Sequence, residues 1–341
     1  MAYVPENNCT ASLLYTQFVP LYIVHWVQSI LSLATLFFCG LNVAWALNKR
    51  QKEIVNFHVN VKIILLGALF FYILHSILMF CMHFGYVILF HFPTFTDQCV
   101  YSITAWKCLL LRIPSYMTVA GFTFVHLAMC IERSIATAKI NKYQQYNFKI
   151  GIFLLFPIFI IPIIWNFWIF HQEDLFNQKA YCMSSSVFSS PRLVIMSYVL
   201  MGFDIIAVII EIVLYKINIR QKLNKISDYS LQKSLQLKEN DISIKLLLPL
   251  SASHTLLFTC YLLLYTSLKF IYDQKDGLSY AAAVESAHLS ETFYTLINVS
   301  LFLYLRRKLA TKTKLVIIES DFKQSARIQI QAEQYLKYCL K

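Results

Sequence analysis

Glu132 and Arg133 are adjacent ionisable residues at the end of a long apolar stretch, within the tract C-I-E-R-S-I-A-T at residues 130–137. A carboxylate beside a guanidinium forms a charge-assisted hydrogen bond that can hold an arginine in place. Two interpretations follow. Arg133 could extend toward lipid headgroups with a solvated glutamate beside it, or the pair could restrain Arg133 until a binding partner releases it.

Other ionisable side chains lie inside apolar stretches. Asp204 and Glu211 are seven residues apart and share one face of a predicted helix. They could bind a polar ligand or form a buried polar network, or they could be structural residues held by hydrogen bonds. We interpret His75, His126 and His254 as core residues. Because no two of these histidines have the spacing of metal ligands, we predict no metal site and no cofactor.

Membrane-spanning helices are the elements that must position these residues. The chain of 341 residues is 58% hydrophobic and 14% charged, whereas soluble domains are about 45–50% apolar and about 25% charged. This composition excludes a disordered chain and argues against a soluble enzyme. Apolar runs long enough to cross about 30 Å of hydrocarbon cover residues 20–47, 57–84, 104–138, 149–170, 193–215, 244–271 and 280–305. We therefore predict an all-α membrane protein, a seven-transmembrane helix bundle, and no enzymatic activity.

Lysine and arginine residues predict the orientation of this bundle. With an extracellular N-terminus, 24 of the 30 lysines and arginines fall on the cytoplasmic side and 6 on the other, and cytoplasmic loops carry such an excess. Residues 1–19 are then an extracellular N-terminus, and residues 306–341 are a basic cytoplasmic tail. The net charge of +12 faces anionic lipid and acidic partners, so we expect no nucleic-acid binding.

Four of the nine cysteines fall on the extracellular side of this topology, where disulfides form. Four cysteines allow three pairings. A bond between Cys108 and Cys182 would hold the loop between the fourth and fifth spans over the mouth of the bundle, and we expect this pair. Cys9 and Cys99 are the remaining pair. Asn8 begins an N-C-T sequon on the same side and is a predicted glycosylation site.

The third span carries a cysteine at one end and an acid–arginine pair at the other. Cys108 precedes Arg133 by 25 residues. This joint spacing resembles the third helix of rhodopsin-like G-protein-coupled receptors, and the resemblance implies a receptor in which Glu132 restrains Arg133 at rest. The seventh span lacks N-P-x-x-Y, the sixth lacks C-W-x-P, and the second has no aspartate. We therefore expect a divergent receptor family rather than an ordinary amine or peptide receptor.

Three short tracts narrow the resemblance. Residues 132–137 resemble the E-R-x-x-A-T tract of nematode serpentine chemoreceptors, particularly the alpha and alpha/beta classes. Residues 236–240 resemble their Q-x-x-E-N stretch, although serine and leucine replace the usual preceding Arg-Tyr, and residues 333–338 resemble their closing E-x-Y-F-x-x-Y tract. The resemblance implies coupling to a heterotrimeric G protein through Glu132, Arg133, Ala136, Thr137, Gln236, Glu239 and Asn240.

We expect a small-molecule ligand to bind in the outer half of the bundle, below the loop that carries Cys182. Tyrosine-rich helix ends are also typical of membrane-interface belts, so a structural role remains an alternative for each candidate. The candidate residues are Arg112, Ser115, Tyr116, Val119, Asp204, Tyr261, Tyr265, Glu285, His288 and Ser290.

The predicted function is that of a chemosensory receptor, located by the resemblance in the plasma membrane and specifically in the ciliary membrane of chemosensory neurons. The expected partners are a small-molecule ligand, a heterotrimeric G protein and membrane lipid, and homo- or hetero-oligomers stay open. The alternative is a seven-span ligand-gated channel or transporter. A transporter would show Gly/Pro-broken helices in matching places, and a channel would show a polar stripe along its pore. The prolines here are unpaired, and only the fifth span approaches such a stripe.

Overall fold

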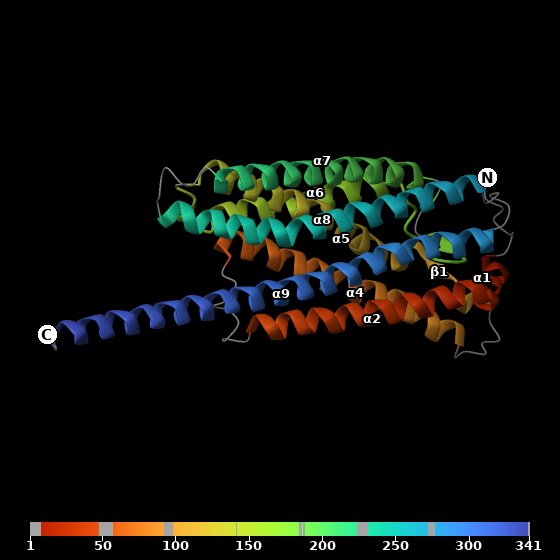
Figure 1. Ribbon diagram of the computed structural model, residues 1–341. Coiled ribbons are helices and arrows are strands. Elements are labelled where there is room, and N and C mark those ends of the chain that lie inside the picture. Colours follow the sequence, from red (N-terminus) through yellow and green to blue (C-terminus); the bar gives the residue numbers. More distant parts are fainter. Residues whose placement is uncertain are drawn as a thin grey trace.

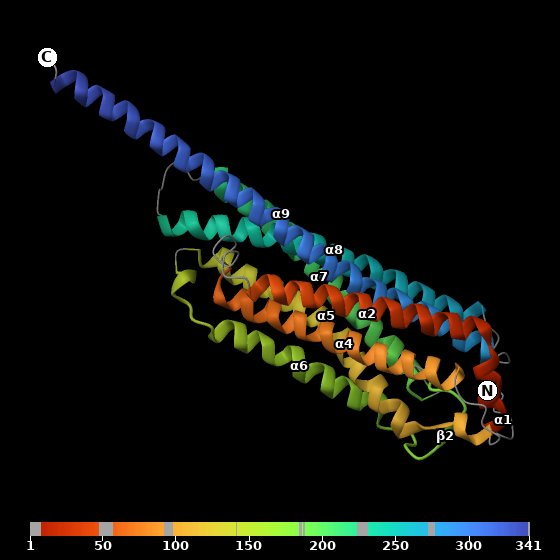
Figure 2. The same cartoon turned by 90° about the horizontal axis from the view of Figure 1, so that it is seen from below.

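The computed structural model describes residues 8–47, 57–91, 98–140, 142–183, 186, 188–223, 231–271 and 277–339. Over these residues the chain is an all-α membrane protein, as predicted, in which long helices run alongside one another (Figure 1, Figure 2). The long helices are α2 (Val19–Leu47), α4 (Val59–His91), α5 (Ala105–Ala138), α6 (Lys149–Phe170), α7 (Ser190–Leu223), α8 (Leu231–Ile271) and α9 (Gly277–Cys339). The short elements are α1 (Asn8–Gln17), η1 (Gln98–Tyr101), β1 (Ile103–Thr104), η2 (Tyr143–Gln145) and β2 (Gln178–Lys179).

Two helices extend well past the spans expected from hydropathy. α8 begins at Leu231 rather than near residue 244, and α9 continues from the seventh span through the expected tail to Cys339. Residues 306–339 contain no glycine or proline to end the helix. At about 1.5 Å per residue α9 is roughly 95 Å long, about three times the hydrocarbon core of a bilayer. Its C-terminal part projects beyond the bundle (Figure 2), and we call this end of the bundle the tail end.

The seventh helix differs in composition from the other six. Within the described ranges, α2, α4, α5, α6, α7 and α8 are long and apolar enough to cross a membrane, and α9 is not among them. α9 carries Glu285, His288, Glu291 and Asn298, which are all buried against neighbouring helices. A helix enclosed by protein tolerates such side chains, because they find partners there instead of lipid. α9 packs against α2 and α8 and completes the bundle.

α5 is the central helix. It packs against α4, α6, α7 and α8, and all residues from Thr118 to His126 are buried. A helix that is buried on every side belongs in the core of a bundle. By contrast, α6 exposes Phe153, Phe156 and Phe167, whose exposed fractions are 75%, 66% and 76%. Apolar side chains exposed in this way lie on the face of a helix that lipid covers.

Disulfides tie the loops together at the end of the bundle opposite the tail end, which we call the disulfide end. Among the described cysteines, Cys9 is bonded to Cys99 and Cys108 is bonded to Cys182. These are the two pairings that we expected. The first joins α1 to η1, and the second joins α5 to the loop that follows β2.

A short antiparallel pairing of β1 with β2 supports the same loop. Ile103 lies opposite Lys179 in this pairing. The backbone N–H of Ala105, the first residue of α5, donates to the carbonyl of Asn177 at 2.9 Å. The loop thus satisfies an amide that has no partner within the helix, and the residues after β2 are held across the mouth of the bundle.

Candidate functional site

Arg133 is buried at the tail end of α5 and is held by two helices. Its Nε and Nη2 donate to the Glu132 carboxylate, with 2.6 Å between Nη2 and Oε1. Its Nη1 donates to the Asn240 amide oxygen at 3.2 Å and to the Ser243 hydroxyl at 3.1 Å, both on α8. The exposed fractions of Glu132 and Arg133 are 0% and 2%. The guanidinium therefore does not extend toward lipid headgroups in this structure; it links α5 to α8.

Two further helices and η2 contribute to the same cluster. The Tyr143 hydroxyl donates to the Glu132 carboxylate, and the Asn60 amide of α4 donates to the Tyr143 oxygen at 3.3 Å. The backbone N–H of Gly151 in α6 donates to the Asn60 amide oxygen at 3.0 Å. Burial, together with the Glu132 carboxylate, raises the pKa of the Tyr143 hydroxyl above its ordinary value. Tyr143 therefore stays protonated and continues to donate to Glu132.

The predicted coupling residues of α8 meet those of α5 at this cluster. The Gln236 amide donates to the Asn240 side-chain oxygen at 3.0 Å, and the Asn240 amide donates to the Thr137 hydroxyl at 3.4 Å. The Glu239 carboxylate accepts a hydrogen bond from the backbone N–H of His58, the residue before α4, at 2.5 Å. Ala136 is buried on the same helix as Thr137. The structure thus gathers at the tail end residues that lie about a hundred positions apart in the sequence.

A second polar cluster occupies the middle of the bundle. Asp204 of α7 lies 3.0 Å from His254 Nε2 on α8, and it accepts the Thr123 hydroxyl of α5 at 3.1 Å. The ring of His126 stacks on the ring of His254, with 4.7 Å between their centroids. All four residues are buried. Asp204 therefore belongs to a buried network, which was one of the alternatives left open by its position.

This network continues toward the tail end. His126 is 3.0 Å from the Ser251 hydroxyl, and that hydroxyl donates to the Glu211 carboxylate at 2.7 Å. The Cys130 thiol donates to the same carboxylate oxygen at 3.4 Å. Cys130 is one helical turn from Arg133. Polar side chains thus form a line from the middle of the bundle to the neighbourhood of the Glu132–Arg133 pair.

At the disulfide end, two of the ligand candidates bind one another. Arg112 of α5 forms an ion pair with Glu285 of α9, and its Nη2 donates to the backbone carbonyl of Cys182 at 3.0 Å. Both charged side chains are buried. Ser115 donates to the Leu111 carbonyl within its own helix at 2.9 Å. The ion pair therefore joins α5, α9 and the disulfide-bonded loop, and it closes the mouth of the bundle.

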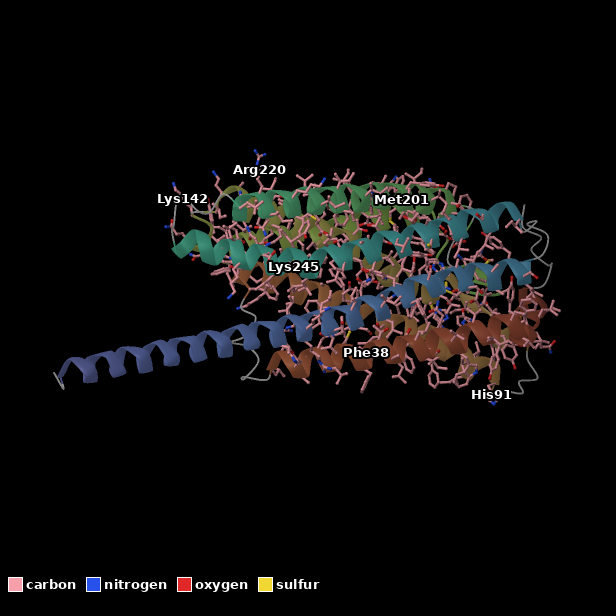
Figure 3. All side chains as sticks on the ribbon, viewed as in Figure 1. Phe38, His91, Lys142, Met201, Arg220 and Lys245 are labelled. Carbon is pink, nitrogen blue, oxygen red and sulfur yellow. A yellow bond between two sulfur atoms is a disulfide. The ribbon has the colours of Figure 1, made fainter. Side chains whose placement is uncertain are left out.

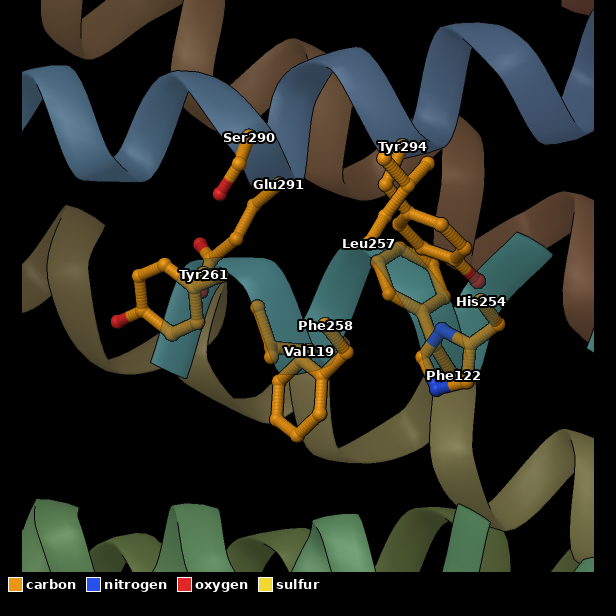
Figure 4. Close-up of a pocket in the computed structure, with 9 residues that line it drawn as sticks. All are labelled: Val119, Phe122, His254, Leu257, Phe258, Tyr261, Ser290, Glu291 and Tyr294. Atoms are coloured by element: carbon orange, nitrogen blue, oxygen red, sulfur yellow. The ribbon is translucent and has the colours of Figure 1, made fainter. Parts of the chain in front are cut away.

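Two neighbouring cavities lie below this ion pair, and each has room for about one water molecule. Their common lining consists of Val119, Phe258, Tyr261 and Glu291. Figure 4 shows the first cavity, which is also lined by Phe122, His254, Leu257, Ser290 and Tyr294. The second is also lined by Tyr116, Leu193, Met196, Ser197 and Tyr265.

The comparisons with known proteins agree with this architecture. The family model for serpentine type 7TM GPCR receptor class ab chemoreceptors matches residues 6–340. The chain belongs to the serpentine class ab chemoreceptor family. It is therefore a multi-pass membrane protein of a receptor family, and receptors of this kind have a ligand and a G protein as partners in general.

Two relatives of this chain come from Caenorhabditis elegans. Serpentine receptor class alpha/beta-14 is 25% identical over 211 residues, which cover 59% of this chain and 52% of that protein. Serpentine receptor class beta-17 is 21% identical over 250 residues, which cover 66% of this chain and 69% of that protein. The chain thus spans about half the length of the first relative.

Not every ligand candidate predicted for this chain reaches the cavities. Tyr116, Val119, Tyr261, Tyr265 and Ser290 line them. The candidates outside both linings are Arg112, Ser115, Asp204, Glu285 and His288.

The sequence analysis missed several residues of the Glu132–Arg133 cluster and of the cavity linings. Glu291 could have been found, because an ionisable residue inside a span is itself a signal. Asn60, Tyr143 and Phe258 carried no such signal. Across the described part of the chain, no group of three or more His, Cys, Asp or Glu side chains could hold a metal ion.

Proposed function

We propose that this chain is a chemosensory receptor that binds a small molecule at the two cavities and activates a heterotrimeric G protein at its tail end. The observation that carries the proposal is the position of Arg133. Its guanidinium bonds Glu132 on α5 and both Asn240 and Ser243 on α8. Moving α8 away from α5 breaks the bonds to α8 and frees Arg133 for a partner, as in other interface switches.

α8 connects the cavities to this switch. Phe258 and Tyr261 line both cavities, and Asn240 lies on the same helix toward the tail end. Pro249 lies between them and cannot donate a backbone hydrogen bond, so the helix can bend there. A ligand that displaces Phe258 or Tyr261 would tilt α8 and pull Asn240 away from Arg133.

The proposed orientation places the disulfide end outside the cell. α1 and the C-terminal part of α9 lie at opposite ends of the molecule (Figure 1), and disulfides persist in oxidising compartments. Lys142 and Arg220 lie toward the tail end, whereas His91 lies at the opposite end (Figure 3). Asn8 begins α1 at the disulfide end and stays a predicted glycosylation site. The plasma membrane, in particular the ciliary membrane of chemosensory neurons, is the proposed location.

The proposal is tested by expressing the receptor with a set of heterotrimeric G proteins and applying a panel of volatile and water-soluble compounds. We expect ligand-dependent nucleotide exchange on one G protein. Arg133→Ala should abolish this exchange and leave ligand binding largely intact. Arg133→Lys should also impair it, because a lysine cannot present the planar fork of a guanidinium to the partner.

Two outcomes would overturn the proposal. Full G-protein activation by both Arg133 variants, at wild-type surface levels, would show that Arg133 is not the switch. A ligand-evoked current that persists in cells without heterotrimeric G proteins would instead indicate the ligand-gated channel.

A further inference from the structure

Carboxylates outnumber cations inside the bundle. The buried carboxyl side chains of the described residues are Glu132, Asp204, Glu211, Glu285 and Glu291. The buried arginines in the same ranges are Arg112 and Arg133, and no lysine there is buried. Each arginine forms an ion pair with one glutamate. The three remaining carboxyl groups lie between these two pairs without a buried lysine or arginine to balance them.

Glu291 is the remaining carboxyl group that lines the cavities. It borders both of them, and its exposed fraction is 7%. Its Oε2 lies 3.3 Å from Nδ1 of His288, one turn earlier on α9, and a histidine carries a charge only when it is protonated. Asp204 lies directly behind the first cavity, against His254. The ionisable groups next to the cavities are therefore carboxyl groups and histidines, and neither lining contains a lysine or an arginine.

Aromatic rings surround this carboxylate. Phe258 and Tyr261 line both cavities with Glu291, and Figure 4 shows Tyr261 beside Glu291 with Phe258 across the cavity. Tyr116 and Tyr265 complete the wall of the second cavity. The faces of aromatic rings attract cations, and the attraction is stronger where water is excluded. An aromatic wall around a buried carboxylate is an arrangement that recognises an organic cation.

We infer that the ligand of this receptor is a small organic cation, a protonated amine on an apolar or aromatic body, whose ammonium group binds Glu291. The inference rests on the proposed function, because it names the ligand class of the same cavities. A protonated amine compensates a carboxylate that is otherwise costly to bury, and its apolar body fits the aromatic walls. An anion would add negative charge beside Glu291 and Asp204, and a neutral molecule would bring no charge to pair with Glu291.

The second, sixth and seventh spans lack the short tracts of an ordinary amine receptor. The carboxylate here comes instead from Glu291, on the α9 part of the seventh span. Because Phe258 and Tyr261 line both cavities, a ligand that displaces either ring merges the two spaces. We therefore expect a ligand of about one ring or a short branched chain.

The test measures binding without a G protein, on the purified full-length receptor in detergent. The probes are ethylamine, isopentylamine, phenethylamine and tryptamine, each compared with its matching alcohol, with phenylacetate as the anion. We expect at least one amine to raise the midpoint of thermal unfolding and to bind at least ten-fold more tightly than its alcohol. Phenylacetate should cause no shift.

Variants of Glu291 test its role. Glu291→Gln keeps the shape of the side chain and should abolish the preference for the amine over its alcohol. Glu291→Asp keeps the charge and should retain that preference with weaker binding. A preference retained by Glu291→Asp and lost in Glu291→Gln would show that the carboxylate, rather than a folding defect, is responsible. The matched control is Asp174→Asn, which removes an exposed carboxylate from the loop at the same end of the bundle and should leave the preference unchanged.

The outcomes separate this inference from the proposed function. Three results would overturn the inference. The first is that an alcohol binds as tightly as its matching amine, or that phenylacetate binds as tightly as the amines. The second is that no amine shifts the unfolding midpoint, and the third is that the preference for the amine survives Glu291→Gln. Amine binding without activation of any G protein would support the inference and contradict the proposed function. Activation of a G protein by neutral compounds alone would support the proposed function and contradict the inference.

Discussion

The ion pair of Glu132 and Arg133 is buried at the tail end, and a buried pair is strongly sensitive to the loss of one partner. Glu132 is the acceptor of this cluster: it accepts from the arginine and also from the Tyr143 hydroxyl. Arg133 is the donor, and of this pair it is the residue that bonds α8, through Asn240 and Ser243. Under the proposed function the two residues have separable roles, Glu132 in holding the guanidinium and Arg133 in carrying it to a partner.

Glu132→Gln should raise signalling in the absence of ligand. The substitution removes a charge-assisted hydrogen bond, which contributes about 1.5–3 kcal/mol to the restrained state. Because 1.4 kcal/mol corresponds to a factor of ten, we expect the active population to rise roughly 10- to 100-fold from a small initial value. The measurement is basal nucleotide exchange on the coupled G protein, normalised to receptor at the cell surface.

Two further variants serve as controls for Glu132→Gln. Tyr143→Phe removes one bond to the carboxylate but leaves the ion pair, so it should lower the unfolding midpoint with a smaller rise in basal exchange. Asn240→Ala leaves the pair intact and weakens only the link to α8, so it should also raise basal exchange. Basal exchange at the wild-type level in both Glu132→Gln and Asn240→Ala would contradict a restraining role for the cluster.

Helix packing positions the cluster at the scale of the elements. α6 approaches α4 so closely that a Cβ added to Gly151 would lie 2.9 Å from the Cα of Asn60 and 3.1 Å from its backbone oxygen. A backbone neighbour cannot rotate away as a side chain can. Asn60 also donates to Tyr143, so the fit of α6 against α4 determines where the hydroxyl that binds Glu132 lies.

Gly151→Ala should therefore destabilise the receptor and disturb the cluster. Overpacking of this kind costs about 1–3 kcal/mol, measured as a lower midpoint of thermal unfolding in detergent. Gly202→Ala on α7 is the matched control, because a Cβ there meets no atom within 4 Å. That variant should be neutral, or stabilising by up to about 1 kcal/mol from helix propensity. Equal midpoints for the two variants would show that the close approach of α6 to α4 does not limit stability.

The disulfide end and the tail end define the polarity of the whole molecule. An epitope tag at the N-terminus should be accessible on intact cells, whereas a tag at the C-terminus should be stained only after permeabilisation. The physical reason is the excess of lysine and arginine on the tail side of the membrane. The reverse pattern of staining would contradict both the orientation and the proposed coupling, since Arg133 would then face the outside.

The bond between Cys108 and Cys182 holds the loop across the mouth of the bundle. Cys108→Ala should reduce surface expression and lower the unfolding midpoint, because removing a native disulfide costs about 2–5 kcal/mol in small secreted domains. Cys81→Ala is the matched control, since Cys81 is a free, exposed cysteine of α4, and it should have little effect. Peptide mapping under non-reducing conditions that pairs Cys108 with Cys9 would contradict the assignment.

The sequence by itself determined the class of the protein, because hydropathy and charge are local properties. Apolar runs of sufficient length partition into lipid, and lysine and arginine bias the orientation, whatever the tertiary packing. It indicated seven long helices, the pairing of Cys108 with Cys182, and residues of α5 and α8 that meet at the tail end, including Arg133 and Asn240. The sequence did not indicate where α8 begins or where α9 ends. Hydropathy marks the part of a helix that lipid can surround, whereas α9 continues past that part to Cys339 because no glycine or proline interrupts it there.

Only the tertiary structure decided which polar groups meet. Tyr143 binds Glu132, and Glu291 borders the cavities, through contacts between elements far apart in the sequence. Spacing along one helix shows which residues share a face, but it does not show which neighbouring helix that face meets. Arg112 illustrates the difference: it was predicted as a ligand residue, yet Glu285 already occupies its guanidinium. Three buried carboxyl groups of the described ranges have no buried lysine or arginine to match them. This charge balance depends on which side chains pair, and so it follows from the packing of the helices.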